Sequence, residues 1–325
     1  MPRPLLYTLL LGAIAVLSLF SLAVGKVWIP WSAWRTLGDD PSWIIILELR
    51  LPRTILGIMV GVALGISGAV LQGYTRNPLA DPTVLGVSSM ASFGAVLTLY
   101  LGVAGTMPWV LPVGAMAGAA LGVVILLALA GATSSILTFI LAGAILQIVA
   151  TAGVSLALNL APNPWAVNEI VNWMMGSLAD RSVDDVRMAF PFIVAGCIML
   201  GFTARALDAL TLGETGALSL GVRLNVVRVL IAVGVAMAAG ASVAVTGAIG
   251  FVGLVAPHLL RPLVGARPGA LILPSGLAGA VIVLAADIVV RLMPSVAEVK
   301  LGVAMAALGG PFFLLLLVKM RRRVA

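Results

Sequence analysis

The sequence contains very few charged residues. Asp, Glu, Lys and Arg make up 10% of the 325 residues, and hydrophobic residues make up 62%. A soluble domain carries about a quarter charged residues. The mean hydropathy is +1.18. These values exclude a soluble core-rich domain and predict a polytopic membrane protein.

The chain also lacks residues that several functional classes require. Cys197 is the single cysteine, so an internal disulfide is excluded. His258 is the single histidine, and one imidazole without a second His or Cys nearby makes a poor metal site. No G-x-x-x-x-G-K-[ST] pattern is present. We therefore expect no metal or cofactor in this chain, and if ATP drives the protein, a partner subunit binds ATP and Mg²⁺.

What the sequence does contain is a series of apolar runs, which predict an all-α protein with about ten transmembrane helices. They cover residues 5–25, 54–75, 83–101, 109–130, 137–158, 188–206, 226–245, 247–264, 270–290 and 301–318. The run 54–75 has 22 residues without a charge, and as a helix it would span about 33 Å, the thickness of a bilayer core. The first run could also be a cleaved signal peptide, although its length favours a span. The run 247–264 is short and contains Pro257, which predicts a broken or half-length helix.

Two longer connections separate these runs. Residues 26–49 are predicted to form a mixed loop with several tryptophans, which are typical of the membrane interface. Residues 159–187 are predicted to form an extramembrane loop with a short amphipathic helix near 168–178.

The second run carries small residues at every fourth position. They are Gly57, Gly61, Gly65, Ala69 and Gly73. Such a stripe lets a neighbouring helix approach backbone to backbone in lipid. We therefore expect this helix to pack closely against another.

The distribution of charge predicts the orientation. With ten spans and both termini in the cytoplasm, the cytoplasmic segments hold 11 basic and 3 acidic residues, a net charge of +8. The outer segments hold 8 basic and 9 acidic residues, a net charge of −1, which together give the formal +7 of the chain. Basic residues collect on the cytoplasmic side of membrane proteins. The count therefore supports two cytoplasmic termini, and the lysines and arginines do not form a nucleic-acid-binding face.

Several strings of the sequence together resemble the FecCD-type permeases of ABC importers, from about residue 50 to the C-terminus. The matching strings are Arg50-Leu51-Pro52-Arg53, Ser67-Gly68-Ala69 with Gln72, Arg76-Asn77-Pro78-Leu79-Ala80 with Pro82, Leu85 and Gly86, Gly250 to Val255 with Pro257, His258 and Arg261, Ala286-Asp287-Ile288 with Arg291, and Gly302 with Gly309 to Phe313.

This resemblance implies a function. It implies that residues 1–325 form one permease domain, located in the bacterial inner membrane. A second copy of the permease would complete a homodimer. The resemblance also implies two ATP-binding subunits and a periplasmic substrate-binding protein as partners. The permease itself would be non-catalytic and would work by alternating access. Its cargo would be an iron complex, haem or a ferric siderophore, with cobalamin as the alternative.

A polar segment between the sixth and seventh runs is the candidate coupling site. Residues 208–223 are too short and polar to span the membrane, yet they include apolar leucines. Exposed apolar side chains suggest a docking surface, and the resemblance implies two short helices here that fit a cleft of the ATP-binding subunit. An ordinary amphipathic loop is the alternative. The candidate coupling residues are Thr211, Leu212, Gly213, Glu214, Ala217, Leu220 and Gly221.

Three arginines lie on the predicted outer side, where positive charge is disfavoured. They are Arg50, Arg53 and Arg291. Arginine pairs bidentately with carboxylates, and the resemblance implies that these arginines meet glutamates of the binding protein. The alternatives are snorkelling or a local ion pair, for example between Arg291 and Asp287, one helical turn away.

The translocation path is predicted from the resemblance alone. It implies a cytoplasmic gate near the start of the fifth helix and in the Asn-Pro-Leu turn. The candidate gate residues are Asn77, Leu79, Ser134, Ser135, Ile136, Leu137 and Thr138. Helix capping by Ser134 or Ser135 is the alternative.

Two other classes of protein fit the sequence less well. An ion-coupled secondary transporter would need carboxylates near mid-membrane, and of the acidic residues only Asp287 falls within a predicted span, away from its centre. An intramembrane enzyme would need a polar catalytic cluster, and the single histidine lies near the predicted cytoplasmic side.

Overall fold

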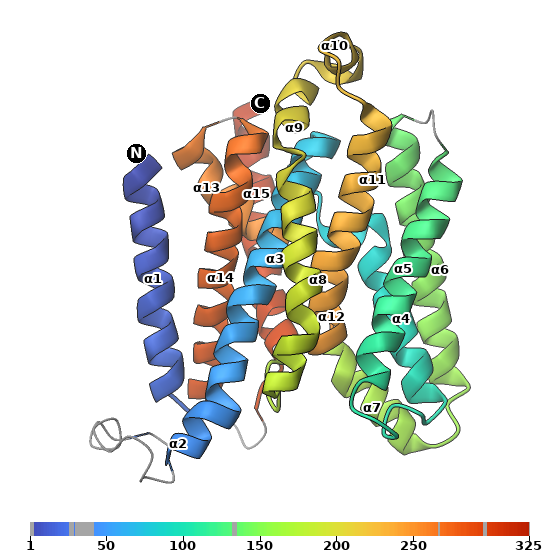
Figure 1. Ribbon diagram of the computed structural model, residues 1–325, viewed down its shortest axis with the longest axis vertical. Helices are drawn as coiled ribbons and strands as arrows, with labels where there is room; N and C mark the ends of the chain where they lie inside the picture. The colour runs from blue at the N-terminus through green and yellow to red at the C-terminus, as the bar shows by residue number, and fades with distance from the viewer. Residues whose placement is uncertain are drawn as a thin grey trace.

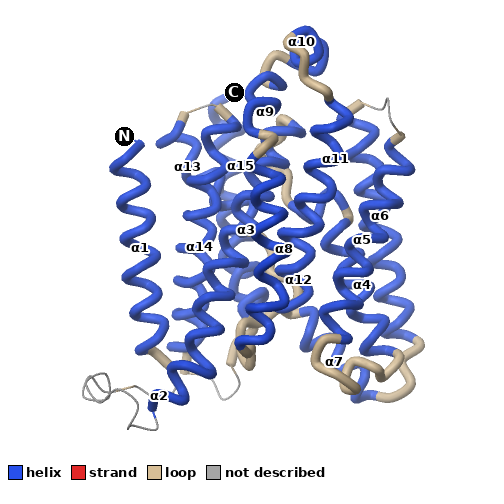
Figure 2. Tube along the Cα trace, viewed as in Figure 1, coloured by secondary structure: helices blue, strands red, loops and turns tan. Residues whose placement is uncertain are grey.

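The computed structural model describes residues 3–25, 29, 42–131, 135–265, 267–294 and 298–324, with the backbone alone for residues 42 and 315–324. Within these ranges every regular element is a helix, as Figure 2 shows. The all-α prediction is confirmed. Ser134 and the three tryptophans at 28, 31 and 34 lie outside the described residues.

Each of the ten predicted runs contains a helix. These helices are α1 (Arg3–Ala23), α3 (Leu51–Thr75), α4 (Val87–Tyr100), α5 (Val110–Ala130), α6 (Ile136–Asn159), α8 (Val183–Gly201), α11 (Leu224–Val235), α13 (Val252–Val264), α14 (Pro268–Leu292) and α15 (Leu301–Val324). Helix α11 continues through a π-helical turn, η3 (Ala236–Gly240), into α12 (Ala241–Thr246).

Shorter helices connect them. They are α2 (Ser42–Ile44), the π-helix η1 (Ile45–Arg50), the 3₁₀ helix η2 (Pro82–Leu85), α7 (Pro164–Met174), α9 (Ala204–Leu210) and α10 (Gly213–Ser219). Two predicted loops are therefore shorter than expected. Residues 42–49 are helical, and α8 begins at Val183 because Ser182 and Asp185 form a capping box.

The number of complete spans is smaller than ten by length alone. Six helices of the described chain are long and apolar enough to cross a membrane, and the pair α8 and α9, bent by 42°, would be a seventh only if the two formed one span. Helices α4 and α13 and the apolar part of α15 are shorter. The exact count of ten is therefore not confirmed.

Helix α13 is half-length, as predicted, but the interruption is not at Pro257. The chain is non-helical from Gly247 to Phe251, and Pro257 lies inside the helix. Proline removes the N–H that would bond the carbonyl four residues earlier, here that of Gly253. The side chain of Gln72 replaces it, because its Nε2 donates to the Gly253 carbonyl at 3.2 Å.

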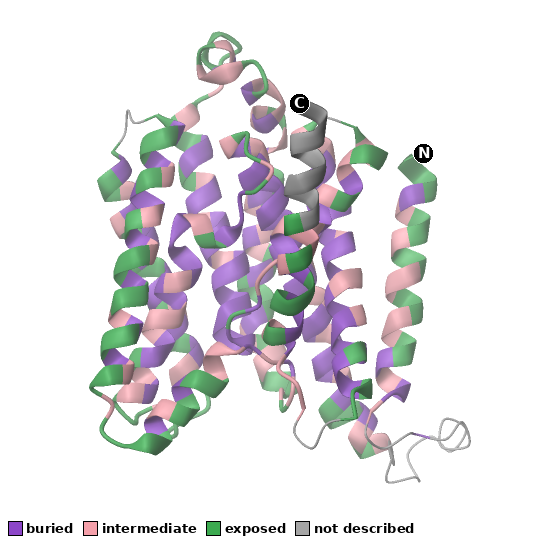
Figure 3. Ribbon diagram, turned by 180° about the vertical axis from the view of Figure 1, so that it is seen from behind, coloured by how far each residue is buried: buried purple, intermediate pink, exposed green. Residues whose placement is uncertain are grey.

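Helices α3 and α14 run beside each other through the middle of the bundle (Figure 1). A Cβ atom on Gly61 would lie 2.5 Å from the Cα atom of Ala280, and one on Gly65 would lie 2.1 Å from the Ser275 carbonyl oxygen. A Cβ atom on Gly279 would lie 2.0 Å from the Gly61 carbonyl. The predicted small-residue stripe therefore brings the two backbones into direct contact. Figure 3 shows the buried residues concentrated in the centre and the exposed ones on the periphery.

The two ends of the molecule carry different elements. Figure 1 shows the N-terminus, the C-terminus, α9 and α10 at one end, and α2 and α7 at the other. This arrangement agrees with two termini on one side of the membrane. We call the first end the coupling end and the second the outer end.

Candidate functional site

The predicted coupling segment, residues 208–223, contains the end of α9 and all of α10, and α10 projects from the coupling end (Figure 1). Leu210 and Ala217 are buried, whereas Leu212 and Leu220 are 69% and 64% exposed. Gly213 (φ +87°) and Gly221 (φ +79°) hold left-handed conformations at the start of α10 and just after its end, where a side chain would be strained. The segment thus exposes two leucines, and its glycines allow the chain to turn at both ends of α10.

Helix α10 is also tied to the predicted gate. The Glu214 carboxylate accepts a hydrogen bond from the backbone N–H of Ile136, at 3.2 Å from Oε1. Ile136 is the first residue of α6, and free N–H groups at a helix start are normally satisfied by a nearby acceptor. The structure therefore joins a predicted coupling residue to a predicted gate residue.

The gate residues themselves are organised by local capping. The Ser135 side chain accepts a hydrogen bond from the Thr138 N–H at 3.3 Å, which confirms the capping role predicted as the alternative. Leu137 is exposed, and Ile136 is buried. In the other part of the gate, the Asn77 side chain accepts from the Leu79 N–H at 2.9 Å and closes the turn after α3. A gating role for these residues stays a prediction.

The outer arginines are buried and bonded within the chain, with exposed fractions of 6% for Arg50, 9% for Arg53 and 8% for Arg291. Arg53 binds the carboxylates of Asp287, at 2.7–3.1 Å, and Glu298. Arg291 also pairs with Asp287, at 2.9 Å. The local pair predicted between Arg291 and Asp287 is therefore confirmed.

Two of these arginines donate hydrogen bonds to carbonyl groups at the C-terminal end of α1. Arg50 donates to the carbonyls of Leu22 and Ala23 at 2.9 and 2.7 Å. Arg291 donates to the carbonyls of Ser21 and Val24 at 2.8 and 3.0 Å. The last carbonyls of a helix lack partners inside it, and cations are favourable there. This contact explains positive charge on the outer side, and sequence reasoning missed it.

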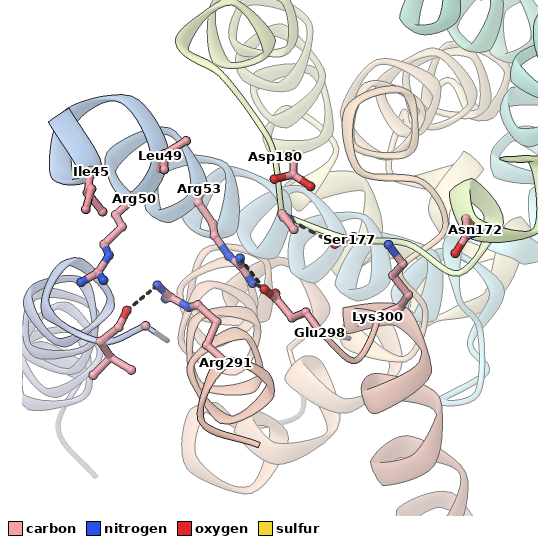
Figure 4. A pocket seen from close by; sticks show the side chains of 13 residues that line it. Ile45, Leu49, Arg50, Arg53, Asn172, Ser177, Asp180, Arg291, Glu298 and Lys300 are labelled. Atoms are coloured by element: carbon pink, nitrogen blue, oxygen red, sulfur yellow. Dashed lines mark hydrogen bonds and ion pairs between the residues drawn. The ribbon is translucent and has the colours of Figure 1, made fainter. Parts of the chain in front are cut away.

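The three arginines line one cavity of about 540 Å³ at the outer end. Figure 4 shows their side chains together with Glu298 and Lys300, and with Asp180 from the segment after α7. The prediction that these arginines dock a binding protein is untested. The cavity nevertheless places them at a common opening.

Asp81 is a buried carboxylate that sequence reasoning treated only as part of a turn. It caps η2, accepting from the Thr83 N–H at 3.1 Å. It also lines a cavity of about 120 Å³ with serines of α4. Burial raises the pKa of this carboxyl above its ordinary value, and the hydrogen bond from Thr83 opposes that rise.

His258 packs edge-on against the Phe312 ring, with 6.1 Å between ring centroids. This contact between α13 and α15 agrees with a structural role for the histidine.

The sequence pattern of the FecCD transport family matches residues 13–319. The chain belongs to this family. Proteins similar to it include an uncharacterised ABC transporter permease, YvrB, of Bacillus subtilis, which is 39% identical over 87% of this chain and 82% of the relative. The vitamin B12 import system permease BtuC of Salmonella typhi is 37% identical over 94% of this chain and 92% of the relative.

A solved structure agrees with this FecCD assignment. It is described as an inward-facing conformation of a metal-chelate type ABC transporter. It matches the present fold with a TM-score of 0.85 and 30% sequence identity, over 97% of this chain and 99% of that one. The chain is therefore an ABC importer permease, a non-catalytic, multi-pass membrane subunit.

Proposed function

We propose that this permease imports a metal chelate delivered by a substrate-binding protein and is driven by two ATP-binding subunits. The observation that carries the proposal is the projecting helix α10, whose Glu214 is hydrogen-bonded to the start of α6. Movement of α10 by an ATP-binding subunit would pull directly on α6. The assembly would contain two copies of this chain in a bacterial inner membrane, with α9 and α10 in the cytoplasm.

We propose an iron complex, haem or a ferric siderophore, as the cargo. The likeness to a metal-chelate type transporter supports this class. Cobalamin, a cobalt chelate, is the second candidate, and the similarity to a vitamin B12 permease at 37% identity favours it.

The direct experiment is ATP-driven uptake into proteoliposomes. The complete complex with its binding protein is offered haem, a ferric siderophore and cobalamin side by side. Selective uptake of one identifies the cargo. If a complex that assembles and hydrolyses ATP takes up none of them, the metal-chelate proposal is wrong.

The docking role of the outer cavity needs a separate test. Arg50→Gln keeps an N–H donor for the α1 carbonyls and removes the charge. An exposed arginine, Arg187, is the matched control, because its pair with Asp184 lies on the surface. We expect Arg50→Gln to weaken binding-protein affinity about tenfold or more, since a lost charged hydrogen bond costs about 1.5–3 kcal/mol. Equal affinities for the two variants would contradict docking at this cavity.

A further inference from the structure

A second cavity, at the coupling end, is lined by three arginines. It has a volume of about 310 Å³ and lies between the end of α3, the link between α9 and α10, and the connection from α13 to α14. The arginines are Arg76, Arg261 and Arg267, and no aspartate or glutamate is among the described lining residues. We call this cavity the arginine pocket.

The arginines come from three elements. Arg76 is the C-cap of α3, Arg261 lies in the last turn of α13, and Arg267 is the N-cap of α14. Within the described ranges, none of the three forms an ion pair. The Asp208 carboxylate accepts the Gly269 N–H at 2.8 Å, and it forms no ion pair with these arginines within the described ranges. The pocket therefore collects three positive charges that form no ion pair within the described part of the chain.

One arginine is held in a fixed orientation. Arg261 donates from Nη2 to the Gln72 side-chain oxygen at 2.8 Å. The Gln72 amide nitrogen is in turn held by the carbonyls of Gly253 and Leu254, at 3.2 and 3.4 Å. The remaining N–H groups of Arg261 keep their donor capacity. This support pre-organises a cationic group at the pocket wall.

We propose that the arginine pocket binds a phosphate group. Phosphate offers several strong acceptor oxygens, and the planar fork of arginine matches them bidentately. Basic pockets between transmembrane helices on the cytoplasmic side bind lipid head groups. Ala69 and Leu271 line the same cavity, which suits the apolar part of a lipid. The phosphate could come from an anionic phospholipid or from solution, and the chemistry of recognition is the same.

The position of the pocket links phosphate binding to coupling. Thr211, between α9 and α10, lines it. A Cβ atom on Gly213 would lie 3.8 Å from Nη1 of Arg76. A bound phosphate would therefore hold the base of the coupling helices against α3 and α14.

The test measures lipid retention by the full-length permease. The double variant Arg76→Gln with Arg267→Gln removes two charges from the pocket and leaves the Arg261–Gln72 link intact. The control, Arg3→Gln with Arg205→Gln, removes two charges from the same end, outside the pocket. Each protein is purified from vesicles of phosphatidylcholine and phosphatidylglycerol, and the co-purified lipids are counted by native mass spectrometry. Inorganic phosphate is titrated separately by calorimetry.

We expect the pocket variant to lose phosphatidylglycerol affinity about fivefold for each arginine removed, with the control unchanged. Arg-dependent binding of inorganic phosphate without lipid retention would also support the site and identify a soluble source. Equal retention by both double variants, with no phosphate binding by the unmodified chain, would overturn the proposal. The proposal would also be overturned if the only defect of the pocket variant were a failure to assemble with the ATP-binding subunit. The pocket would then bind a carboxylate of that partner. If the double variant aggregates, Arg267→Gln alone, at an exposed position, carries the comparison.

Discussion

The contact between α3 and α14 predicts that one added methyl group will destabilise the protein. In Gly65→Ala, the new Cβ atom would lie 2.1 Å from the Ser275 carbonyl oxygen, whereas ordinary contact begins at 3.4 Å. The obstructing atom belongs to the backbone and cannot rotate away, so the helices would have to separate by roughly 1 Å. Overpacking of this kind costs about 1–3 kcal/mol.

The chain offers two matched controls for this change. A methyl group added to Gly12, on α1, would meet no atom of the described chain within 4 Å, so Gly12→Ala should be neutral or slightly stabilising. Gly57 is on α3 itself, but its methyl would meet the flexible end of Leu284 at 3.2 Å, so Gly57→Ala should have a small effect.

The measurement is thermal unfolding of the purified permease in detergent, followed by tryptophan fluorescence. We expect the midpoint to fall for Gly65→Ala and to stay near the wild-type value for Gly12→Ala and Gly57→Ala. If all three variants unfold together with the wild type, the backbone contact between α3 and α14 is not as close as described.

Three further changes test other contacts. Asp287→Ala removes the carboxylate shared by two buried arginines and should cost about 3–5 kcal/mol of stability. The surface change Asp184→Ala should cost less than about 1 kcal/mol. Similar losses of stability for the two variants in unfolding experiments would show that burial of the ion pair does not matter here. Gln72→Leu leaves the Gly253 carbonyl without its donor and should cost about 1–3 kcal/mol, and an unchanged unfolding midpoint would refute that bridging role. Glu214→Ala should reduce the rate of cargo uptake by the complex more than the rate of ATP hydrolysis. The neighbouring change Thr215→Ala should leave the ratio of uptake to hydrolysis unchanged. A parallel fall in both rates for Glu214→Ala would argue against coupling through α10.

The sequence predicts contacts that depend on local spacing. Five small residues at intervals of four predict the close face of α3, and the i, i+4 spacing predicts the pair between Asp287 and Arg291. Resemblance to the family predicts the two short coupling helices. In each case the relevant atoms lie within one helix or one short segment.

Contacts between distant segments could not be predicted in this way. Arg53 meets Glu298 across 245 positions, and Gln72 reaches Gly253 across 181. The sequence does not show that Gln72 compensates for the N–H missing at Pro257. Pro257 is therefore predicted to interrupt the helix, although the non-helical segment precedes α13. The arginines at the outer end likewise suggested an external partner, because nothing in the local sequence shows that the end of α1 lies beside them.

The anchoring of α1 has a consequence for biogenesis. Only 11% of the residues in its apolar window are buried, so most of this helix faces outward from the bundle. One of the two arginines that bind its last carbonyls, Arg291, lies 270 positions after its partner Ser21. Helix α1 is synthesised first, yet this attachment forms only after α14 has entered the membrane. The first helix therefore remains incompletely attached to the bundle through most of translation, and a chain that stops before α14 would leave it so.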